Sequence, residues 1–149
     1  MASLGINERS PVFSVNTHVQ YRGWIGAKGT TGESLRLEAI RVKQEGALNL
    51  CLRPYVSNIG WMATQCTNGR GNTITVGTTG RSLAIEALEM RLTEGSCKAV
   101  GGRVVLHANA HLAGIGWTPY QFVGCGQTLT LGTTGQRRRM EAFDAAIGI

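Results

Sequence analysis

Gly29-Thr30-Thr31-Gly32-Glu33-Ser34-Leu35-Arg36-Leu37-Glu38-Ala39-Ile40 is the stretch that decides the fold, because its pattern occurs three times in the chain. The tetrapeptide Gly-Thr-Thr-Gly returns at residues 77–80 and 132–135, at spacings of 48 and 55 residues. A glutamate and an alanine follow each copy, nine residues after its first glycine. Self-similarity at such a period is typical of a domain built from internal repeats. We expect residues 1–149 to form a single domain of three repeats, at about residues 10–46, 47–96 and 97–149.

A Gly-Trp pair precedes each turn, with the tryptophan at Trp24, Trp61 or Trp117. The residues leading into each pair alternate or run apolar and are rich in Val and Leu, a pattern that indicates a half-buried strand. These expected strands cover residues 12–19, 48–52 and 104–108. Each repeat is therefore expected to open with a strand that ends at a Gly-Trp corner.

A second long strand is expected after each turn, at residues 35–42, 83–92 and 138–143. In the first of them Leu35 and Leu37 fall on one parity, whereas Ile40 and Val42 fall on the other. An extra residue at Glu38-Ala39, a β-bulge, would keep all four side chains in the core and would re-aim the glutamate. The same switch of parity occurs at Glu86-Ala87.

The segment between tryptophan and turn differs between the repeats. It spans 16 positions in the second repeat and 15 in the third, but only 5 from Trp24 to Gly29. Asn68-Gly69 is a strong hairpin signal, so an added hairpin is expected in the second and third repeats. The pocket of the first repeat is expected to be truncated or missing. Short, turn-like connections at residues 44–46 and 93–102 would let the last strand of one repeat pair with the first strand of the next.

The order of long strand, hairpin and long strand predicts an all-β protein. One repeat cannot bury its apolar face alone, whereas three repeats around a pseudo-threefold axis can. A β-trefoil-like domain is the first expectation, and a β-prism of three sheets around a common core is the alternative.

Composition sets a few limits on function. No signal peptide is visible at the start, and no apolar run is long enough for a membrane span. The four cysteines lack CxxC spacing, which argues against zinc; two disulfides and four buried thiols both stay open, so the redox compartment is undetermined. The net charge is +6, and Arg137-Arg138-Arg139 is interpreted as a solvated face, with polyanion attraction as a minor alternative.

No catalytic arrangement stands out. His18, His107 and His111 lie in expected strands, and a nucleophile with its base would be unique rather than repeated. We therefore expect a protein without enzymatic activity, metal site or cofactor.

The repeated Trp, Thr-Thr and Glu have a coherent use in sugar binding. A sugar needs an aromatic platform for its C–H face and polar groups for its hydroxyls. The repeats supply such groups at matching places, and weak sites gain strength through multivalency. The candidate carbohydrate-binding residues are His18, Trp24, Thr30, Thr31, Arg36 and Glu38 in the first repeat, Trp61, Thr78, Thr79 and Glu86 in the second, and His111, Trp117, Tyr120, Thr133, Thr134, Arg139 and Glu141 in the third.

Structural interpretations compete with this one at each position. The tryptophans could fill a threefold core, and the Gly-Thr-Thr-Gly turn could be only a turn. The glutamate could form a local tie to Arg36 or Arg139, two residues before it, but Ala84 stands at that place in the second repeat. A structural adhesion or protein-interaction module is therefore kept as the alternative function, and it predicts that Trp61 and Trp117 are buried.

His18-Val19 with Gly23-Trp24, followed by the stretch from Gly29 to Ile40, resembles the clostridial hydrophobic W (ChW) repeat family, which also occurs in actinobacteria. The resemblance covers nearly the whole chain. It implies a bacterial module, secreted or on the cell surface, that binds polysaccharide or glycoprotein, and some relatives behave as small lectins. A fucose- or galactose-type sugar is the expected ligand. The expected partners are glycans or glycoproteins, without nucleic acid or membrane insertion, and a homo-oligomer is left open.

Overall fold

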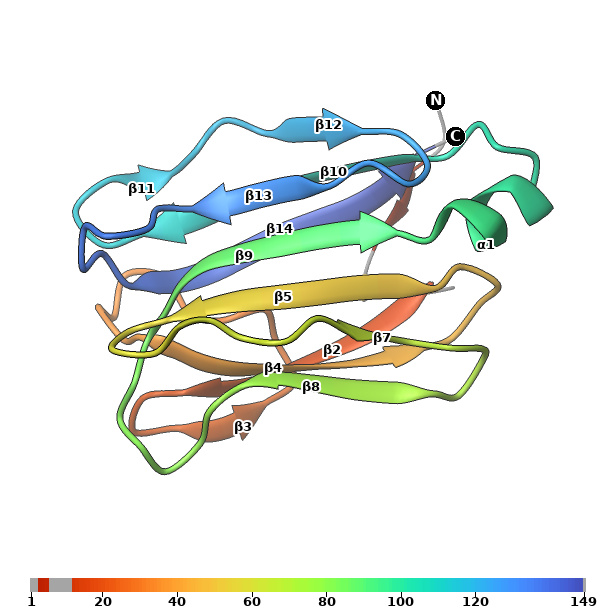
Figure 1. Ribbon diagram of the computed structural model, residues 1–149. Helices are drawn as coiled ribbons and strands as arrows, with labels where there is room; N and C mark the ends of the chain where they lie inside the picture. Colours follow the sequence, from red (N-terminus) through yellow and green to blue (C-terminus); the bar gives the residue numbers. More distant parts are fainter. Residues whose placement is uncertain (1–2, 6–11, 149) are drawn as a thin grey trace.

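The computed structural model describes residues 3–5 and 12–148, so the expected start of the first repeat near residue 10 lies outside the described residues. The described chain folds into three antiparallel sheets and one short helix, and none of these sheets closes into a barrel (Figure 1). The all-β prediction is confirmed. In the described part of the chain, no helix has the length and apolar character that a membrane span requires.

The first sheet is built mainly from the first repeat. Its long strands β2 (Phe13–Val19) and β4 (Leu37–Gln44) pair antiparallel. The short β3 (Gly23–Ile25) flanks β2, and β8 (Thr73–Gly77) flanks β4. The alternating burial of β2 places Phe13, Val15 and Val19 in the core, as the period of two predicts.

The second sheet has the same plan. Its long strands are β5 (Leu50–Val56) and β9 (Ile85–Leu92). Strands β6 (Gly60–Trp61) and β7 (Gln65–Cys66) pair with β5, and β13 (Leu129–Gly132) pairs with β9.

The third sheet contains both the first and the last strand. Its long strands are β10 (Val105–Leu112) and β14 (Met140–Gly148). Strands β11 (Gly116–Trp117) and β12 (Gln121–Val123) pair with β10, and β1 (Ser3–Gly5) pairs with β14.

Two predictions about strand pairing are wrong. The segments after Trp61 and Trp117 are not hairpins, because β7 and β12 stay on their own sheet while β8 and β13 cross to the sheet of the preceding repeat. The last strand of a repeat does not pair with the first strand of the next; instead, the two long strands of one repeat pair with each other. Each crossing strand covers a sheet edge that would otherwise expose unpaired backbone groups.

The short first repeat leaves a different edge. By analogy with β8 and β13, the first repeat would supply a strand that pairs with β14, but among its described residues only 28–30 form backbone contacts with that strand. Gly29 bridges to Ala142, and the amide of Phe143 donates to the carbonyl of Lys28 at 3.0 Å. Strand β1 pairs farther along, from Gly5 opposite Ala146 to Ser3 opposite Gly148. The third sheet therefore receives two short pieces where the other sheets receive one continuous strand.

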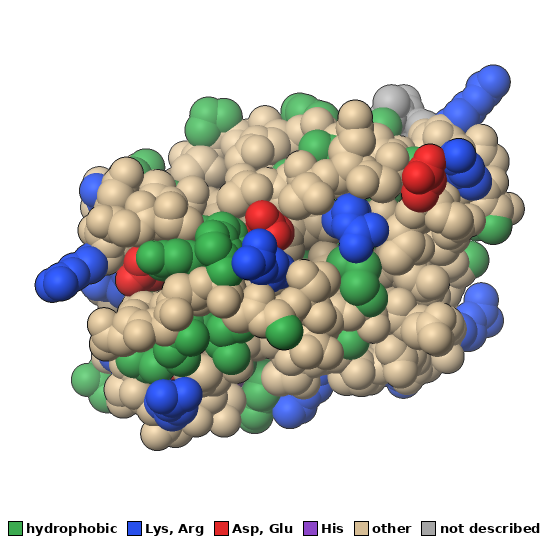
Figure 2. Space-filling view, in the orientation of Figure 1, with side chains coloured by type: hydrophobic (Ala, Val, Ile, Leu, Met, Phe, Trp, Pro, Cys, Tyr) green, Lys and Arg blue, Asp and Glu red, His purple; other side chains and the backbone are tan. Residues whose placement is uncertain are grey.

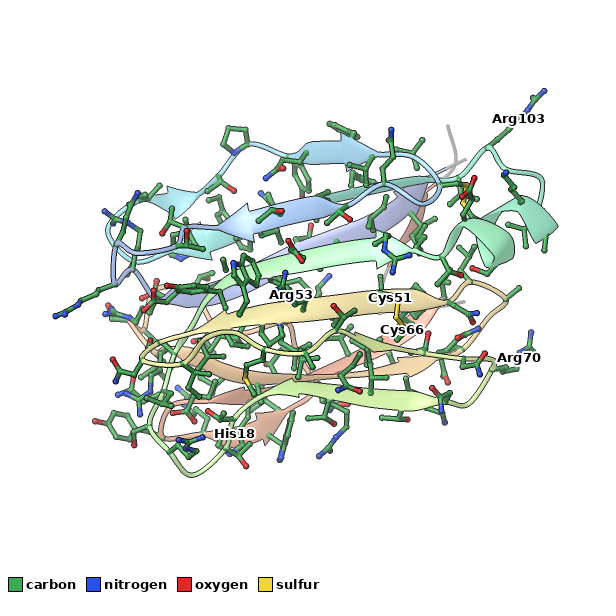
Figure 3. The ribbon with its side chains drawn as sticks, in the orientation of Figure 1. His18, Cys51, Arg53, Cys66, Arg70 and Arg103 are labelled. Atoms are coloured by element: carbon green, nitrogen blue, oxygen red, sulfur yellow. A yellow bond between two sulfur atoms is a disulfide. The ribbon has the colours of Figure 1, made fainter. Side chains whose placement is uncertain are left out.

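The connection after Thr93, expected to be turn-like, contains α1 (Glu94–Ala99). The buried Cys97 of this helix forms a disulfide with Cys125, and Cys51 forms a second disulfide with Cys66, drawn in Figure 3. The four cysteines are therefore two disulfides rather than free thiols. The Cys97–Cys125 bond fixes the helix to the loop before β13, which holds a segment too short to be a stable helix alone.

One hydrophobic core lies inside the three sheets. It takes its largest side chains from the long strands of every repeat, among them Phe13, Leu52, Leu88, Leu106 and Phe143. No tryptophan belongs to this core in the described residues.

Candidate functional site

Each repeated glutamate occupies a β-bulge. His18 pairs with Ala39 while Val19 pairs with Leu37, which leaves Glu38 as the extra residue. The same shift leaves Glu86 unpaired between Ile85 and Ala87, so the predicted bulges are confirmed. A third bulge occurs at Glu141. All three glutamates are only 5% exposed, so their carboxylates need partners within the protein.

In the first repeat the partners of Glu38 are a histidine and an arginine. The Nδ1 atom of His18 lies 2.8 Å from Glu38 Oε1, and Arg36 Nε donates to Oε2 at 2.8 Å. Trp24 is the cross-strand neighbour of His18, and the two rings meet edge to face at 5.4 Å between centroids. The local tie between glutamate and arginine is therefore present.

The third repeat builds the same cluster. His111 Nδ1 lies 3.0 Å from Glu141 Oε1, and Arg139 Nε donates to Oε2 at 3.1 Å. Trp117 meets the ring of His111 at 5.3 Å. In both repeats the two carboxylate oxygens of the glutamate are already engaged, and the cluster orients its own histidine.

The second repeat keeps the glutamate but not its partners. Tyr55 takes the place of the histidine, and Ala84 takes the place of the arginine. The ring of Tyr55 meets Trp61 at 5.4 Å, as the histidines do in the other repeats. Glu86 Oε2 accepts a hydrogen bond from Ser57 Oγ at 2.8 Å.

The Gly-Thr-Thr-Gly turns join neighbouring repeats. The amide of Thr78 donates to the carbonyl of Glu38, the amide of Thr133 to that of Glu86, and the amide of Thr30 to that of Glu141, at 3.0 to 3.1 Å. The turn of each repeat therefore meets the glutamate of the preceding repeat, and the first turn meets the last glutamate. The sequence-based grouping of turn and glutamate within one repeat is corrected accordingly.

The first glycine of each turn is required by this contact. A Cβ atom on Gly29 would lie 2.3 Å from the carbonyl oxygen of Glu141, and the φ angle of Gly29 is +100°. Gly77 and Gly132 show the same close approach to Glu38 and Glu86. A side chain would therefore both clash and adopt an unfavourable backbone conformation.

The two threonines of each turn have different environments. The hydroxyls of Thr30, Thr78 and Thr133 are buried at the junction and have no hydrogen-bond partner among the described residues. Thr31, Thr79 and Thr134 are exposed. Of the six threonines that were predicted as ligand contacts, only these three are exposed.

The interpretation of the tryptophans as core residues is wrong. Trp24 and Trp61 are partly exposed, and an arginine covers each ring: Arg41 lies 4.0 Å from the centroid of Trp24, and Arg53 lies 4.8 Å from that of Trp61. Figure 3 labels Arg53 beside β5. Such cation–π contacts stabilise both partners. Trp117 is 48% exposed, and no arginine covers its ring among the described residues.

The open ring of Trp117 borders a cavity of about 480 Å³, lined also by Lys28, Asn109, Tyr120 and Asp144. Lys28 Nζ donates to Asp144 Oδ1 at 2.7 Å, and the hydroxyl of Tyr120 donates to Asp144 Oδ2 at 2.5 Å. Asn109 is only 6% exposed, and its Oδ1 has no partner in the described structure. The cavity thus combines two half-exposed aromatic rings with fixed donors and acceptors.

Asp144 stays ionised in this setting. Burial raises the pKa of Asp144, but the hydrogen bonds from Lys28 and Tyr120 and the charge of Lys28 outweigh that effect, so the pKa lies below its ordinary value. The hydrogen bond to Asp144 raises the pKa of Tyr120, which keeps the phenol protonated. A carboxylate acceptor and a hydroxyl are thus both available at neutral pH.

Sequence reasoning found Trp117 and Tyr120 but missed Lys28, Asn109 and Asp144. A signal for Asp144 was present: the third residue after each repeated glutamate is Arg41, Glu89 or Asp144. The change from arginine to aspartate at this position coincides with the uncovered tryptophan.

The arginine run beside the third turn is only partly free. Arg138 donates to the carbonyl of Ala113, and Arg139 binds Glu141, whereas Arg137 is exposed. On the face shown in Figure 2, Lys and Arg side chains are scattered rather than gathered into one patch.

Comparison with known proteins identifies a family for part of the chain. The family model Clostridial hydrophobic W matches residues 18–46 and 55–94, which cover the bulged glutamates, tryptophans and turns of the first two repeats. Residues 95–149 lie outside the match. Searches of curated proteins and of solved structures find no matching relative. The segments 18–46 and 55–94 therefore match the clostridial hydrophobic W family, as the resemblance in the sequence predicted for these two repeats.

Proposed function

We propose that this chain is a carbohydrate-binding protein whose open site is the cavity beside Trp117. The observation that carries the proposal is the uncovered Trp117 ring, which lines one cavity together with Tyr120, Asp144 and Lys28. A volume of about 480 Å³ is within the range of ligand pockets.

The chemistry of the cavity suits a sugar. The faces of Trp117 and Tyr120 can pack against the C–H face of a pyranose ring. Asp144 can accept hydrogen bonds from hydroxyls, and Lys28 can donate to them. Charge-assisted hydrogen bonds to Asp144 are stronger than neutral ones and favour vicinal hydroxyls in a fixed orientation. A fucose- or galactose-type terminal sugar of a glycan or glycoprotein is the proposed ligand, bound without catalysis.

The three repeats contribute unequally to this proposal. Arg41 and Arg53 already occupy the ring faces of Trp24 and Trp61, so a sugar would have to displace an arginine there. Multivalent binding, which the repeats suggest, would use these two positions only as weaker secondary sites.

We further propose that the three sheets are arranged as a β-prism with pseudo-threefold symmetry, rather than as a β-trefoil. The support is that the same crossing occurs from the second repeat to the first sheet and from the third repeat to the second sheet. The contact of the first turn with Glu141 closes the cycle. A trefoil would need a closed barrel of strands.

Secretion or display on a bacterial cell surface is also proposed. All four cysteines of the chain are in disulfides, which persist in oxidising environments.

The proposal is tested by glycan-array binding competed with free sugar, followed by titration calorimetry. We expect Trp117→Ala to weaken binding about two- to twelvefold, because aromatic contacts contribute about 0.5 to 1.5 kcal/mol. Trp24→Ala is the matched control, with the same repeat position but an arginine-covered ring, and it should leave the affinity of the Trp117 cavity for the monovalent sugar unchanged. Equal binding by the Trp117→Ala variant and wild type, or no sugar-competed binding at all, would contradict the proposal.

A protein-interaction module is the second candidate; its prediction of buried Trp61 and Trp117 is wrong, but Ile115 and Phe122 are exposed near Trp117 and Tyr120. His107 stacks on Phe122 with the ring centroids 5.4 Å apart. If Phe122→Ser abolished adhesion while sugars failed to compete, this second function would replace the first.

A further inference from the structure

Glu86 differs from the other two bulge glutamates in lacking a cation. Glu38 and Glu141 each bind an arginine two residues earlier in the same strand, whereas the second repeat has Ala84 at that place. Among the described residues, the one side chain that donates to Glu86 is Ser57. A carboxylate that is 5% exposed therefore has a single neutral donor, where its counterparts have two side-chain partners each.

A cavity of about 420 Å³ lies at this carboxylate. It opens at the junction where the turn of the third repeat meets the second repeat. Its lining residues are Tyr55, Ser57, Asn58, Glu86, Gly135 and Arg137. The place that an arginine side chain fills in the other repeats is thus bordered by solvent-accessible space.

We propose that this cavity, the Glu86 socket, binds a guanidinium group from outside the chain. A buried carboxylate favours a cation, and a planar guanidinium can donate to it along a fixed fork. The molecule contains the template twice: Arg36 Nε lies 2.8 Å from Glu38, and Arg139 Nη2 lies 3.0 Å from Glu141. In the socket an incoming guanidinium would take the same place against Glu86.

The lining favours guanidinium over ammonium. Tyr55 lines the same cavity as Glu86, and guanidinium groups stack on aromatic faces while they donate in their own plane. Ser57 and Asn58 add neutral polar groups. An ammonium group has a compact, strongly hydrated charge. It therefore gains less binding energy from stacking on the aromatic ring, and it cannot donate two parallel hydrogen bonds to the carboxylate as a guanidinium can.

Arg137 is the charged residue that opposes this assignment, because it lines the same cavity with the charge of the proposed ligand. It is exposed, and no ion pair joins it to Glu86 in the described structure. Because Arg137 lines the cavity, we expect Arg137→Gln to remove like-charge repulsion and to strengthen guanidinium binding about twofold. If this substitution weakened guanidinium binding, Arg137 would help to hold the ligand instead of repelling it, and the proposal would be overturned.

The guanidinium could come from a free small molecule or from an arginine side chain of a peptide. Both share the chemistry, and three probes distinguish them: methylguanidinium, free L-arginine and N-acetyl-arginine amide. Binding of N-acetyl-arginine amide as tight as that of L-arginine indicates a peptide side chain. A preference for L-arginine indicates that the socket also reads the free α-carboxylate and α-amino groups.

The test is an NMR titration of the full chain with each probe. Wild type should show saturable shifts at the residues of the Glu86 socket, and N-acetyl-lysine amide should bind at least fivefold more weakly. Glu86→Gln should weaken guanidinium binding at least tenfold. Glu89→Gln, on the same strand but paired with Arg53, is the matched control and should bind like wild type.

The decisive variant is Ala84→Arg. It places in the second repeat the arginine that the first and third repeats have at this position, so that the chain's own guanidinium can bind Glu86. We expect it to abolish saturable guanidinium binding while keeping the chain folded, so the test does not depend on how well Glu86→Gln folds. Wild-type binding by Ala84→Arg, or no saturable binding by wild type, would overturn the proposal. Trp117→Ala should leave these titrations unchanged, which separates this inference from the proposed sugar site.

Discussion

The sheets that carry Trp24 and Trp117 contain the same cluster of tryptophan, histidine, glutamate and arginine, but they differ in whether the tryptophan ring is covered. Each has a tryptophan against a histidine, and the histidine against a buried glutamate that also binds an arginine. In the first sheet Arg41 covers the tryptophan. In the third sheet Asp144 stands at that register position, and the tryptophan faces a cavity.

The difference shows that a cavity can form where a sheet lacks a continuous edge strand. Strand β8 runs beside β4 and places Thr75 opposite Arg41. The first repeat is too short to send such a strand to β14, and it reaches that strand only through residues 28–30. Lys28 from this short piece then pairs with Asp144 at the cavity. The short loop of one repeat therefore shapes the site of another.

The largest expected effect comes from breaking the junction that both sheets share. Gly29→Ala, which sets a Cβ 2.3 Å from the Glu141 carbonyl, should lower the free energy of unfolding by about 4 kcal/mol, from clash and backbone strain together. Gly77→Ala should cost a similar amount, because its Cβ would lie 2.4 Å from the Glu38 carbonyl. Chemical denaturation measures both.

Gly32→Ala is the control for this pair. Its φ angle is +75°, but nothing lies within 4 Å of the added Cβ, so it should cost only about 1 kcal/mol. If Gly29→Ala were as mild as this control, the junction between the first and third repeats would not be equivalent to the others.

The second prediction converts the third sheet into the first. Asp144→Arg should cover Trp117 and remove the carboxylate acceptor, which should weaken sugar binding about 100-fold, or about 2.7 kcal/mol. Asp144→Asn, which removes the charge but leaves the ring open, should weaken binding about tenfold. Calorimetry on the two variants separates these contributions.

The reciprocal change should not create a site. Arg41→Asp uncovers Trp24, but β8 still runs beside this position, so we expect no gain of sugar binding. A gain would mean that the arginine alone closes the first sheet and that the missing strand is irrelevant.

The smallest expected effect is a pH dependence confined to the third sheet. Because its folded-state pKa is lowered, Asp144 contributes stability that is present above the ordinary value of 3.8 and is lost as the pH falls through the folded-state value. Sugar affinity should therefore stay constant from about pH 8 to about pH 5 and decline only in stronger acid. Titration of wild type and Asp144→Asn checks this; a decline centred near pH 6 would point to a histidine instead.

Local sequence patterns predicted much of the fold. The parity switch at Glu38 and Glu86 predicted the bulges, because each strand must keep its apolar side chains in one core. The expected ends of the opening strands at the Gly-Trp pairs are wrong, because each long strand ends before its pair and the pair begins a separate short strand. The helix after Thr93 was missed, since a segment held by the Cys97–Cys125 disulfide carries little signal of its own.

The candidate site was predicted only in part. Trp117 and Tyr120 stand out because aromatic side chains at repeat positions are visible in the sequence. Lys28 lies more than a hundred residues from Asp144, and nothing local connects the two. Likewise, Glu38 and Thr78 belong to different repeats, so aligning the repeats put the threonine beside the wrong glutamate.

The sequence by itself determined three repeats, an all-β chain and bulged strands, because these follow from periods and turns within a few residues. Only the tertiary structure decided which repeat covers which sheet edge, which tryptophan stays open and which glutamate lacks a cation. Those features depend on pairings between segments that are distant in the sequence. The same local motif forms different contacts in each repeat, because the segment that crosses from one sheet to the next differs in length.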